Sequence, residues 1–232
     1  VKNLDEQSKH YSEVAETIWK WAEPGYQEAK TMRLLQNELM QEGFSFTYET
    51  AGMPTAFIAS YGTGHPVIGV LAEMDALSGL SQENKPVRAP LVEGGYGHAC
   101  GHNLFGAGSV AAAISIKKWM IANNVKGTIR LYATPAEEGA GGGKTYLVKA
   151  GVFNDVDAVL HWHPGDNNNA SPSSSLAYKL GMFRFKGLAA HAAAAPEKGR
   201  SALDGAEAMN FMANMMREHV SQESRIHYVI KK

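Results

Sequence analysis

The stretch Val67-Ile68-Gly69-Val70-Leu71-Ala72-Glu73-Met74-Asp75 decides the fold class, because an apolar run passes directly into two carboxylates. A short apolar run that follows turn residues, here residues 62–66, predicts a buried β-strand. In an open α/β sheet, ligand-binding residues gather at the carboxyl ends of the strands. We therefore expect Glu73 and Asp75 to lie at the edge of the sheet where a functional site forms.

Outward from this strand, helical and strand patterns alternate along the chain. Residues 56–61, 128–133 and 158–161 are further candidate strands. Apolar residues at helical spacing predict helices over residues 11–21, 32–43, 104–120 and 145–150. This alternation predicts an α/β fold with a mostly parallel sheet.

A polar stretch rich in Asn, Ser and Pro, residues 166–175, is the best linker candidate in the chain. Beyond it we expect a strand over 176–186, a helix over 201–219 and a strand over 225–230. The predicted domains are therefore residues 1–170 and 176–232. A lone β-α-β unit with half-covered apolar faces is not a finished domain. We expect the second domain to be incomplete, with the chain breaking off within it.

The composition excludes several classes of function. The net charge of the 232 residues is −1, without the clustered Lys and Arg that nucleic-acid binding needs. No apolar run approaches the ~20 residues that span a bilayer, so we expect no membrane partner. The single cysteine, Cys100, excludes an intrachain disulfide and suits a reducing compartment. We expect a cytoplasmic protein, although a chain that starts at Val1 leaves a removed signal peptide open.

Four polar segments stand at the predicted strand ends or between them: residues 73–75, 98–102, 135–138 and 161–164. Each alone is weak, since a lone cysteine is commonly a small buried hydrophobe and paired Glu or His residues are commonly polar surface. Together they offer thiolate, imidazole and carboxylate, the ligands of zinc and similar metals. The pattern therefore favours a metal site over a bland polar cleft.

The glycine-rich segment of residues 139–145 suggests a rival function, because it follows a strand and precedes a helix as a phosphate-binding loop does. The phosphate-loop pattern requires a glycine where this chain has Glu138. Glu138 and the adjacent Glu137 would also repel a triphosphate. Nucleotide binding is therefore disfavoured.

Residues 72–77, 97–103, 135–138 and 187–196 resemble the amidohydrolase branch of metallopeptidase family 20, which includes the aminoacylases. Within that branch, residues 93–104 are most similar to the aminobenzoyl-glutamate hydrolases. The resemblance implies a zinc-aminopeptidase-like catalytic domain followed by part of an α+β lid and dimerisation domain. It also implies two divalent metal ions, zinc before manganese, cobalt or nickel. The implied reaction is hydrolysis of the amide bond of a small N-acyl amino acid or an aminobenzoyl-glutamate-like substrate.

The same resemblance assigns the metal ligands. They are Cys100, as a thiolate bridging both ions, together with His102, Glu138 and His163. His163 is chosen because it lies six residues beyond Asp157, as in the family pattern, and His161 is the less favoured alternative. His98 stays open between a ligand and a structural hydrogen bond. The other histidines outside the motifs are expected at the surface or in packing: His10, His65, His219 and His227.

Three further residues receive catalytic roles from the resemblance. Glu137 would be the general base, and Asp75 would orient a metal ligand. His191, in the second domain, would stabilise the transition state by reaching into the active site of the partner subunit. A homodimer formed through the second domain is therefore expected.

The chain departs from the family pattern in two places. Many members of the branch carry Asp where this chain has Glu73. The family's chains are also much longer, and they supply a final His ligand that is absent here, so we expect these 232 residues alone to be inactive. The alternatives are a dipeptidase of the same family, or a non-catalytic binding or partner subunit, which would not need Glu137.

Overall fold

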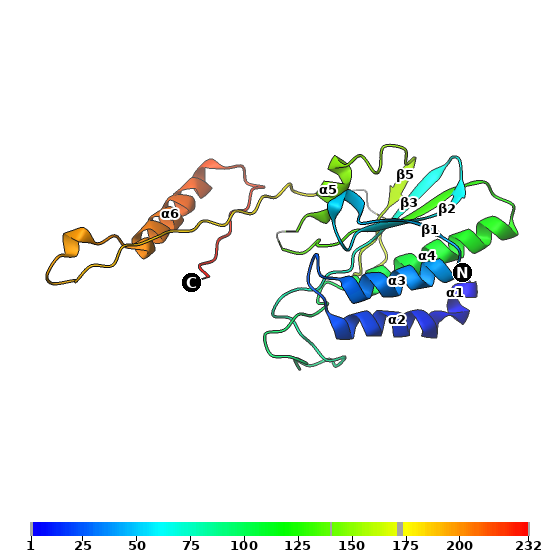
Figure 1. Ribbon diagram of the computed structural model, residues 1–232, viewed down its shortest axis with the longest axis horizontal. Coiled ribbons are helices and arrows are strands. Elements are labelled where there is room, and N and C mark those ends of the chain that lie inside the picture. Colours follow the sequence, from blue (N-terminus) through cyan, green and yellow to red (C-terminus); the bar gives the residue numbers. More distant parts are fainter. Residues whose placement is uncertain (1, 140, 171–173, 232) are drawn as a thin grey trace. The chain divides into compact units, whose positions relative to one another are not determined.

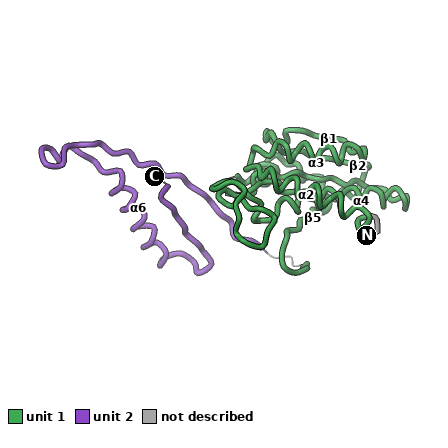
Figure 2. Tube along the Cα trace, turned by 90° about the horizontal axis from the view of Figure 1, so that it is seen from below, with its two compact units in different colours: residues 1–172 green, residues 173–232 purple. Residues whose placement is uncertain are grey.

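The computed structural model describes residues 2–139, 141–170 and 174–231. The chain divides into two compact units, residues 1–172 and 173–232, which Figure 2 colours separately. Of the predicted linker, residues 171–173 lie outside the described residues, and its described part contains neither helix nor strand. The assignment of the second unit as a lid and dimerisation domain stays a prediction.

Unit 1 contains a five-stranded sheet with the strand order β1-β2-β4-β3-β5. Its strands are β1 (Ser45–Tyr48), β2 (Phe57–Thr63), β3 (Val67–Ala72), β4 (Gly127–Ala133) and β5 (Ala158–Leu160). β3 pairs in parallel with β4 and with β5, whereas β2 pairs antiparallel with β1 and with β4. The α/β class is confirmed, but the expectation of a mostly parallel sheet was wrong, because the sheet is mixed.

The connections between strands explain this mixture. Helix α4 (His102–Ala122) joins β3 to β4, and α5 (Gly143–Lys149) lies between β4 and β5. Crossovers through a helix bring strands back in parallel, whereas a short connection turns the chain round. β1 and β2 are joined by the short segment of residues 49–56, so they run antiparallel. The sequence prediction missed β1, of which no described residue is buried.

Three helices cover one face of the sheet: α2 (Ser8–Trp21), α3 (Ala29–Gln41) and α4 (Figure 1). The short α1 (Lys2–Glu6) precedes them. The main core lies between these helices and the sheet, where Ile18, Leu35 and Val110 meet Val70 and Leu131. All five side chains are at most 5% exposed. The helical periods of α2 and α3 therefore reflect a single buried face on each helix.

Helix α4 is 21 residues long and apolar enough, by length and composition, to cross a membrane. Within the protein it packs against α2, α3, β3 and β4, and about half of its most apolar window is buried. Its first residue, His102, is fully buried beside polar groups. We interpret α4 as the central helix of the core, which explains why it is apolar around most of its circumference.

The strand register brings the predicted polar segments to one edge of the sheet. Ala72 of β3 is paired with Ala133 of β4, so the segments that begin at Glu73 and Thr134 leave the sheet side by side. β5 ends at Leu160, directly before His161, and α4 begins at His102. The sheet edge therefore gathers residues that are far apart in sequence.

Unit 2 contains α6 (Ala202–Met216) with the short 3-10 turns Pro196–Lys198 and Arg217–His219. Ser201 caps α6 by accepting a hydrogen bond from the Asp204 amide at 3.1 Å. The strands predicted over 176–186 and 225–230 do not form. The only pairing among the described residues of this unit is an isolated bridge between Leu188 and Arg200. Those predictions were wrong because a strand needs a partner to satisfy its backbone groups, and neither segment has one here.

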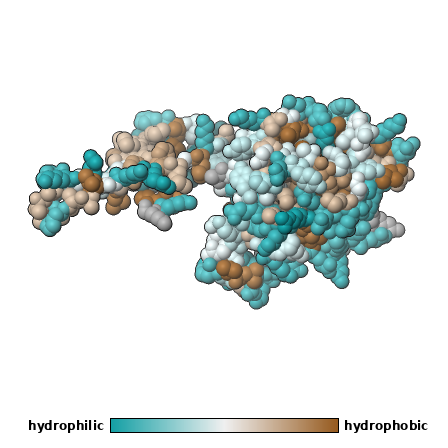
Figure 3. All heavy atoms as spheres, in the orientation of Figure 1, coloured by the Kyte–Doolittle hydropathy of each residue, from teal (hydrophilic) through white to brown (hydrophobic). Residues whose placement is uncertain are grey.

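The described residues of unit 2 form no buried core. None of the side chains of α6 is buried, although the helix is rich in Met and Phe. Phe211 is 67% exposed and Met215 56% exposed. Figure 3 shows the resulting brown, apolar atoms on the surface of this unit.

Candidate metal centre

His102 is the buried centre of the polar cluster at the sheet edge. It is the first residue of α4, and Gly101, at φ +81°, turns the chain into the helix. Its Nδ1 lies 3.0 Å from the carbonyl oxygen of Asp75 and 3.2 Å from Asp75 Oδ1. Because Nδ1 faces two acceptors, it carries the proton, which leaves Nε2 to point into the cluster. An Asp that fixes the tautomer of a histidine in this way is typical of metal-binding histidines.

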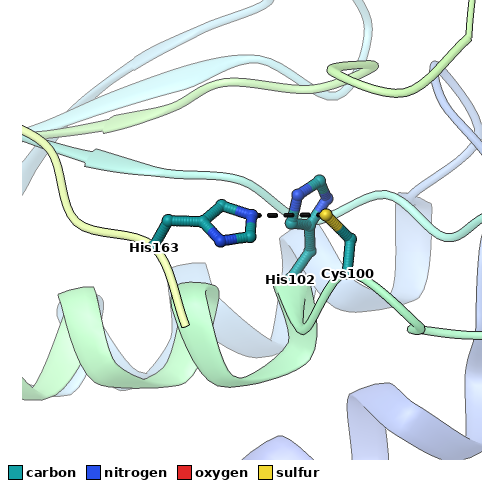
Figure 4. Close-up of side chains that lie close together, drawn as sticks. All are labelled: Cys100, His102 and His163. Atoms are coloured by element: carbon teal, nitrogen blue, oxygen red, sulfur yellow. Dashed lines mark hydrogen bonds between the residues drawn. The ribbon is translucent and has the colours of Figure 1, made fainter. Parts of the chain in front are cut away.

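Cys100 and His163 lie on one side of His102 (Figure 4). The Sγ of Cys100 is 3.3 Å from Nε2 of His163. His163 Nδ1 hydrogen-bonds the carbonyl of Pro164 at 2.9 Å, which turns its other ring nitrogen toward the sulfur. One donor atom from each of Cys100, His102 and His163 lies within 4.8 Å of the other two.

Glu137 and Glu138 approach His102 from the segment after β4. Glu137 Oε2 and Glu138 Oε1 are each 3.9 Å from His102 Nε2. The Glu137 side chain is 42% exposed and the Glu138 side chain 19% exposed. The backbone N–H of Glu138 donates to Asp75 Oδ2 at 2.8 Å, so one buried carboxylate contacts both His102 and this loop.

Glu73 completes the cluster from the end of β3. Its Oε2 lies 2.8 Å from His102 Nε2, and its Oε1 contacts Lys144 Nζ and lies 3.2 Å from His161 Nε2. Burial raises the pKa of Glu73, but His102 and Lys144 outweigh burial and hold that pKa low. A second group of donors, Glu73, His102 and Glu137, therefore shares His102 with the first.

Two observations indicate that a divalent cation fits between these residues. Glu73 Oε2, His102 Nε2 and Glu138 Oε1 are buried without a hydrogen bond of ordinary geometry, and buried polar atoms are rarely left so. Burial, followed by the charge of Glu138, raises the pKa of Cys100 to about 12. Thiolate, imidazole and carboxylate together are the donor set that zinc and similar metals bind.

The structure separates the two candidate histidines near the end of β5. His163 lies against Cys100, whereas His161 lies against Glu73. His98 is 2% exposed and belongs to neither donor group among the described residues. Burial, and then the charge of His102, lowers the pKa of His98 to about 4, which keeps it neutral.

His191 is the predicted site residue that lies in unit 2. Its Nδ1 accepts hydrogen bonds from the backbone amides of Ala193 at 3.2 Å and Ala194 at 3.1 Å. The ring is therefore held by its own turn with Nδ1 as an acceptor, so that Nε2 carries the proton in the neutral tautomer. Its role in catalysis stays a prediction.

The cluster at the strand ends of a mixed α/β sheet defines a candidate metal-binding domain. A sequence model described as Peptidase family M20/M25/M40 matches residues 69–227, which include every candidate ligand. The chain belongs to this peptidase family, as its motifs predicted.

Curated relatives match along nearly the whole chain. One of the two subunits of the p-aminobenzoyl-glutamate hydrolase of Escherichia coli K12 is 43% identical over 98% of this chain and 47% of its own length. The Xaa-Arg dipeptidase of Mus musculus is 30% identical over the full chain and 52% of its own length. The chain thus spans about half the length of these relatives.

Solved structures agree with the fold. A dinuclear metal-binding peptidase of family M20 from Bacillus subtilis is 29% identical, with a TM-score of 0.57 over 68% of this chain and 43% of that one. A structure from methicillin-resistant Staphylococcus aureus gives a TM-score of 0.66 over 96% of this chain and 58% of that one. At 17% identity, the second likeness supports the fold alone.

Proposed function

We propose that this chain is the metal-binding part of an amidohydrolase that cleaves the amide bond of an N-acyl amino acid or an aminobenzoyl-glutamate-like substrate. The observation that carries the proposal is the position of His102, which has Cys100 and His163 on one side and Glu137 and Glu138 on the other. Membership of a peptidase family and the similarity to the p-aminobenzoyl-glutamate hydrolase of Escherichia coli support it.

We further propose that two divalent ions, zinc in the first instance, bind here. Cys100 would bridge them, and His102, Glu138 and His163 would be further ligands. The thiol and imidazole donors favour zinc, while manganese, cobalt and nickel are the alternatives to exclude by metal analysis. Such ions supply Lewis-acid polarisation of a carbonyl and lower the pKa of bound water. The relative from Bacillus subtilis described as dinuclear supports the number of ions.

Glu137 is proposed to move the proton. Its side chain is the more exposed of the Glu pair, at 42%, so it can reach both solvent and a substrate at the cluster. It would take a proton from the attacking water and deliver it to the leaving amine. Asp75 would hold His102 in the tautomer that presents Nε2.

His191 is proposed to act on the oxyanion of a neighbouring subunit in a homodimer formed through unit 2. A hydrogen bond to an oxyanion is typically worth ~3 kcal/mol of transition-state stabilisation. The exposed apolar side chains of α6, including Phe211 and Met215, offer a surface for such contact. A different partner chain is the alternative, since two relatives of this chain bear the names of different subunits of one hydrolase.

A dipeptidase of the same family is the second candidate, because the mouse Xaa-Arg dipeptidase is similar over the whole chain. The two candidates differ in the group on the acyl side of the scissile bond. A dipeptidase substrate carries a free amino group there, whereas an N-acyl amino acid does not. Comparing kcat/KM for acyl amino acids and dipeptides on the same metal-loaded enzyme separates them.

The test of the proposed chemistry is a pair of isosteric changes in the full-length enzyme. Glu137→Gln should retain metal and KM while kcat falls by ~10²–10⁴-fold, the usual effect of losing a general base. Glu138→Gln should instead lower the metal content, because a carboxamide is a poorer ligand than a carboxylate.

Metal analysis and steady-state kinetics on both variants give the result. Loss of metal from the Glu137 variant alone would exchange the two assignments. A wild-type protein that holds its metals and hydrolyses no acyl amino acid or dipeptide would instead favour a non-catalytic binding subunit.

A further inference from the structure

Glu28 is a fully buried carboxylate that no motif of the sequence singled out. It directly precedes α3 and is 0% exposed. Its Oε1 accepts a hydrogen bond from the backbone N–H of Ala136 at 2.9 Å, and its Oε2 accepts one from Thr55 Oγ1 at 2.6 Å. Burying a carboxylate is costly unless it is well hydrogen-bonded, so these bonds specify where it sits.

The bond to Ala136 has a counterpart on the other side of Glu137. The next backbone N–H but one, that of Glu138, donates to Asp75 Oδ2 at 2.8 Å. The amides immediately before and after Glu137 are therefore each bound to a buried carboxylate, Glu28 and Asp75. Neither bond involves the side chain of Glu137, so both act on the path of the backbone.

The backbone needs this support because Ala136 adopts a left-handed conformation, with φ +54°. A non-glycine residue in that region costs ~1–2 kcal/mol, and the cost must be met by surrounding contacts. Without the acceptor at Oε1, the Ala136 amide would be buried and unsatisfied, since Ala136 is 1% exposed. The loop would then relax, and the carboxylate of Glu137 would move with it.

We infer that Glu28 is a positioning residue, which sets the place of the Glu137 carboxylate by holding the Ala136 amide from the start of α3. The inference rests on the proposed function, in which Glu137 is the general base. A displacement of about 1 Å at such a group can reduce a rate by ~100-fold. The role requires an acceptor of the correct reach at position 28 and does not require a charge there.

The experiment compares Glu28→Gln with Glu28→Met in the full-length, metal-loaded enzyme. The two replacements are uncharged and similar in size to glutamate, and they differ in whether an oxygen faces the Ala136 amide. Thr55→Val is the matched control, because it removes the other hydrogen bond of Glu28 and leaves the bond to Ala136. Steady-state kinetics, metal content and NMR hydrogen exchange of the Ala136 amide are measured for each.

Glu28→Met should lower kcat by ~10–100-fold with KM and metal content unchanged, and it should speed exchange of the Ala136 amide at least ~10-fold. Glu28→Gln and Thr55→Val should resemble the wild type in both respects. If the Met variant does not fold, Glu28→Asp replaces it, since its shorter side chain cannot reach both partners.

Three results would overturn the inference. They are wild-type kcat and exchange in the Met variant, equal impairment of the Gln and Met variants, or a loss of kcat that lost metal fully explains. Failure of the proposed function would look different. The wild type would then hydrolyse no amide substrate, while exchange at Ala136 would still report whether Glu28 holds the loop.

Discussion

His102 is the residue on which the whole cluster depends, because both groups of candidate ligands include it. Burial lowers its pKa, but the hydrogen bonds and charges of Asp75 and Glu73 outweigh burial and raise that pKa to about 10. In the metal-free protein His102 is therefore cationic at neutral pH, and it neutralises two buried carboxylates. A metal ion bound at Nε2 would take over that role.

This exchange of proton for metal gives a pH-dependent prediction. Without metal, Cys100 and His102 both carry protons at neutral pH, with pKa values of about 12 and about 10. Both must lose them to bind, so metal binding should release about two protons, and apparent affinity should rise with pH. Calorimetric titration of the metal-free protein in buffers of different ionisation enthalpy counts the protons. Binding that releases none would exclude these two residues as ligands.

Cys100 itself is tested by Cys100→Ser in the full-length enzyme. A serine hydroxyl at this place would not ionise at neutral pH, so it cannot replace a bridging thiolate. We expect metal content to fall by at least about half and kcat by at least ~100-fold, because the remaining donors hold too few ligands per ion. Elemental analysis of the purified variant decides the point, and full metal occupancy would make Cys100 a packing residue.

At the scale of elements, the loop between α2 and α3 ties the site together. The carboxylate of Glu23 accepts hydrogen bonds from the Lys30 and Thr31 amides and so caps α3. The Glu23 carbonyl accepts the amide of Ala76, next to Asp75. Tyr26 donates its hydroxyl hydrogen to the carbonyl of Gly141 at 2.8 Å. One loop thus contacts the segments after β3 and after β4.

Gly25 shows how closely this loop packs against the segment that carries Glu137. A Cβ at position 25 would lie 2.8 Å from Ala136 Cβ and 2.9 Å from Ala136 Cα. Gly25→Ala should therefore destabilise the protein by ~1–3 kcal/mol, as overpacking does, and lower kcat. Gly165→Ala is the control, because its nearest atom would be 3.9 Å away. Urea denaturation compares the two, and equal stability would contradict the close approach.

The sequence predicted the elements that end in the site better than the contacts that support it. The apolar runs of β3 and β4 and the period of α4 predicted which polar residues meet at the sheet edge. Glu28 could not be predicted, because an acidic residue before a helix is an ordinary helix-start signal. Its contact with Ala136 joins residues 108 positions apart, and no local pattern encodes it. Edge strand β1 escaped for a related reason, since no buried residue marks it.

At the scale of the whole molecule, the two units differ in kind. Unit 1 has a continuous core, whereas the described residues of unit 2 leave the apolar side chains of α6 exposed. The predicted strands of unit 2 failed because their pattern was sound but the described chain supplies no strand for them to pair with. The sequence alone cannot reveal such a dependence on partners outside the segment. The cytoplasmic location also stays a prediction.

The trans assignment of His191 can be tested with two inactive variants of the full-length enzyme. His191→Ala and Glu137→Gln homodimers should each be nearly inactive. Mixed and re-annealed, they should form heterodimers in which one of the two sites holds both residues. About a quarter of wild-type activity should return if pairing is random and each site works independently. A confirmed heterodimer that regains no activity would place His191 in the site of its own subunit.

The pair of hydrogen bonds around Glu137 has a consequence for protein design. Glu28 and Asp75 bind backbone amides of the neighbours of residue 137, and neither contact depends on what side chain residue 137 carries. The loop is therefore a socket whose shape is independent of its contents. A histidine, cysteine or tyrosine placed at position 137 would project from the same backbone into the same ring of donors. The position is thus a natural place to install new chemistry without rebuilding the scaffold.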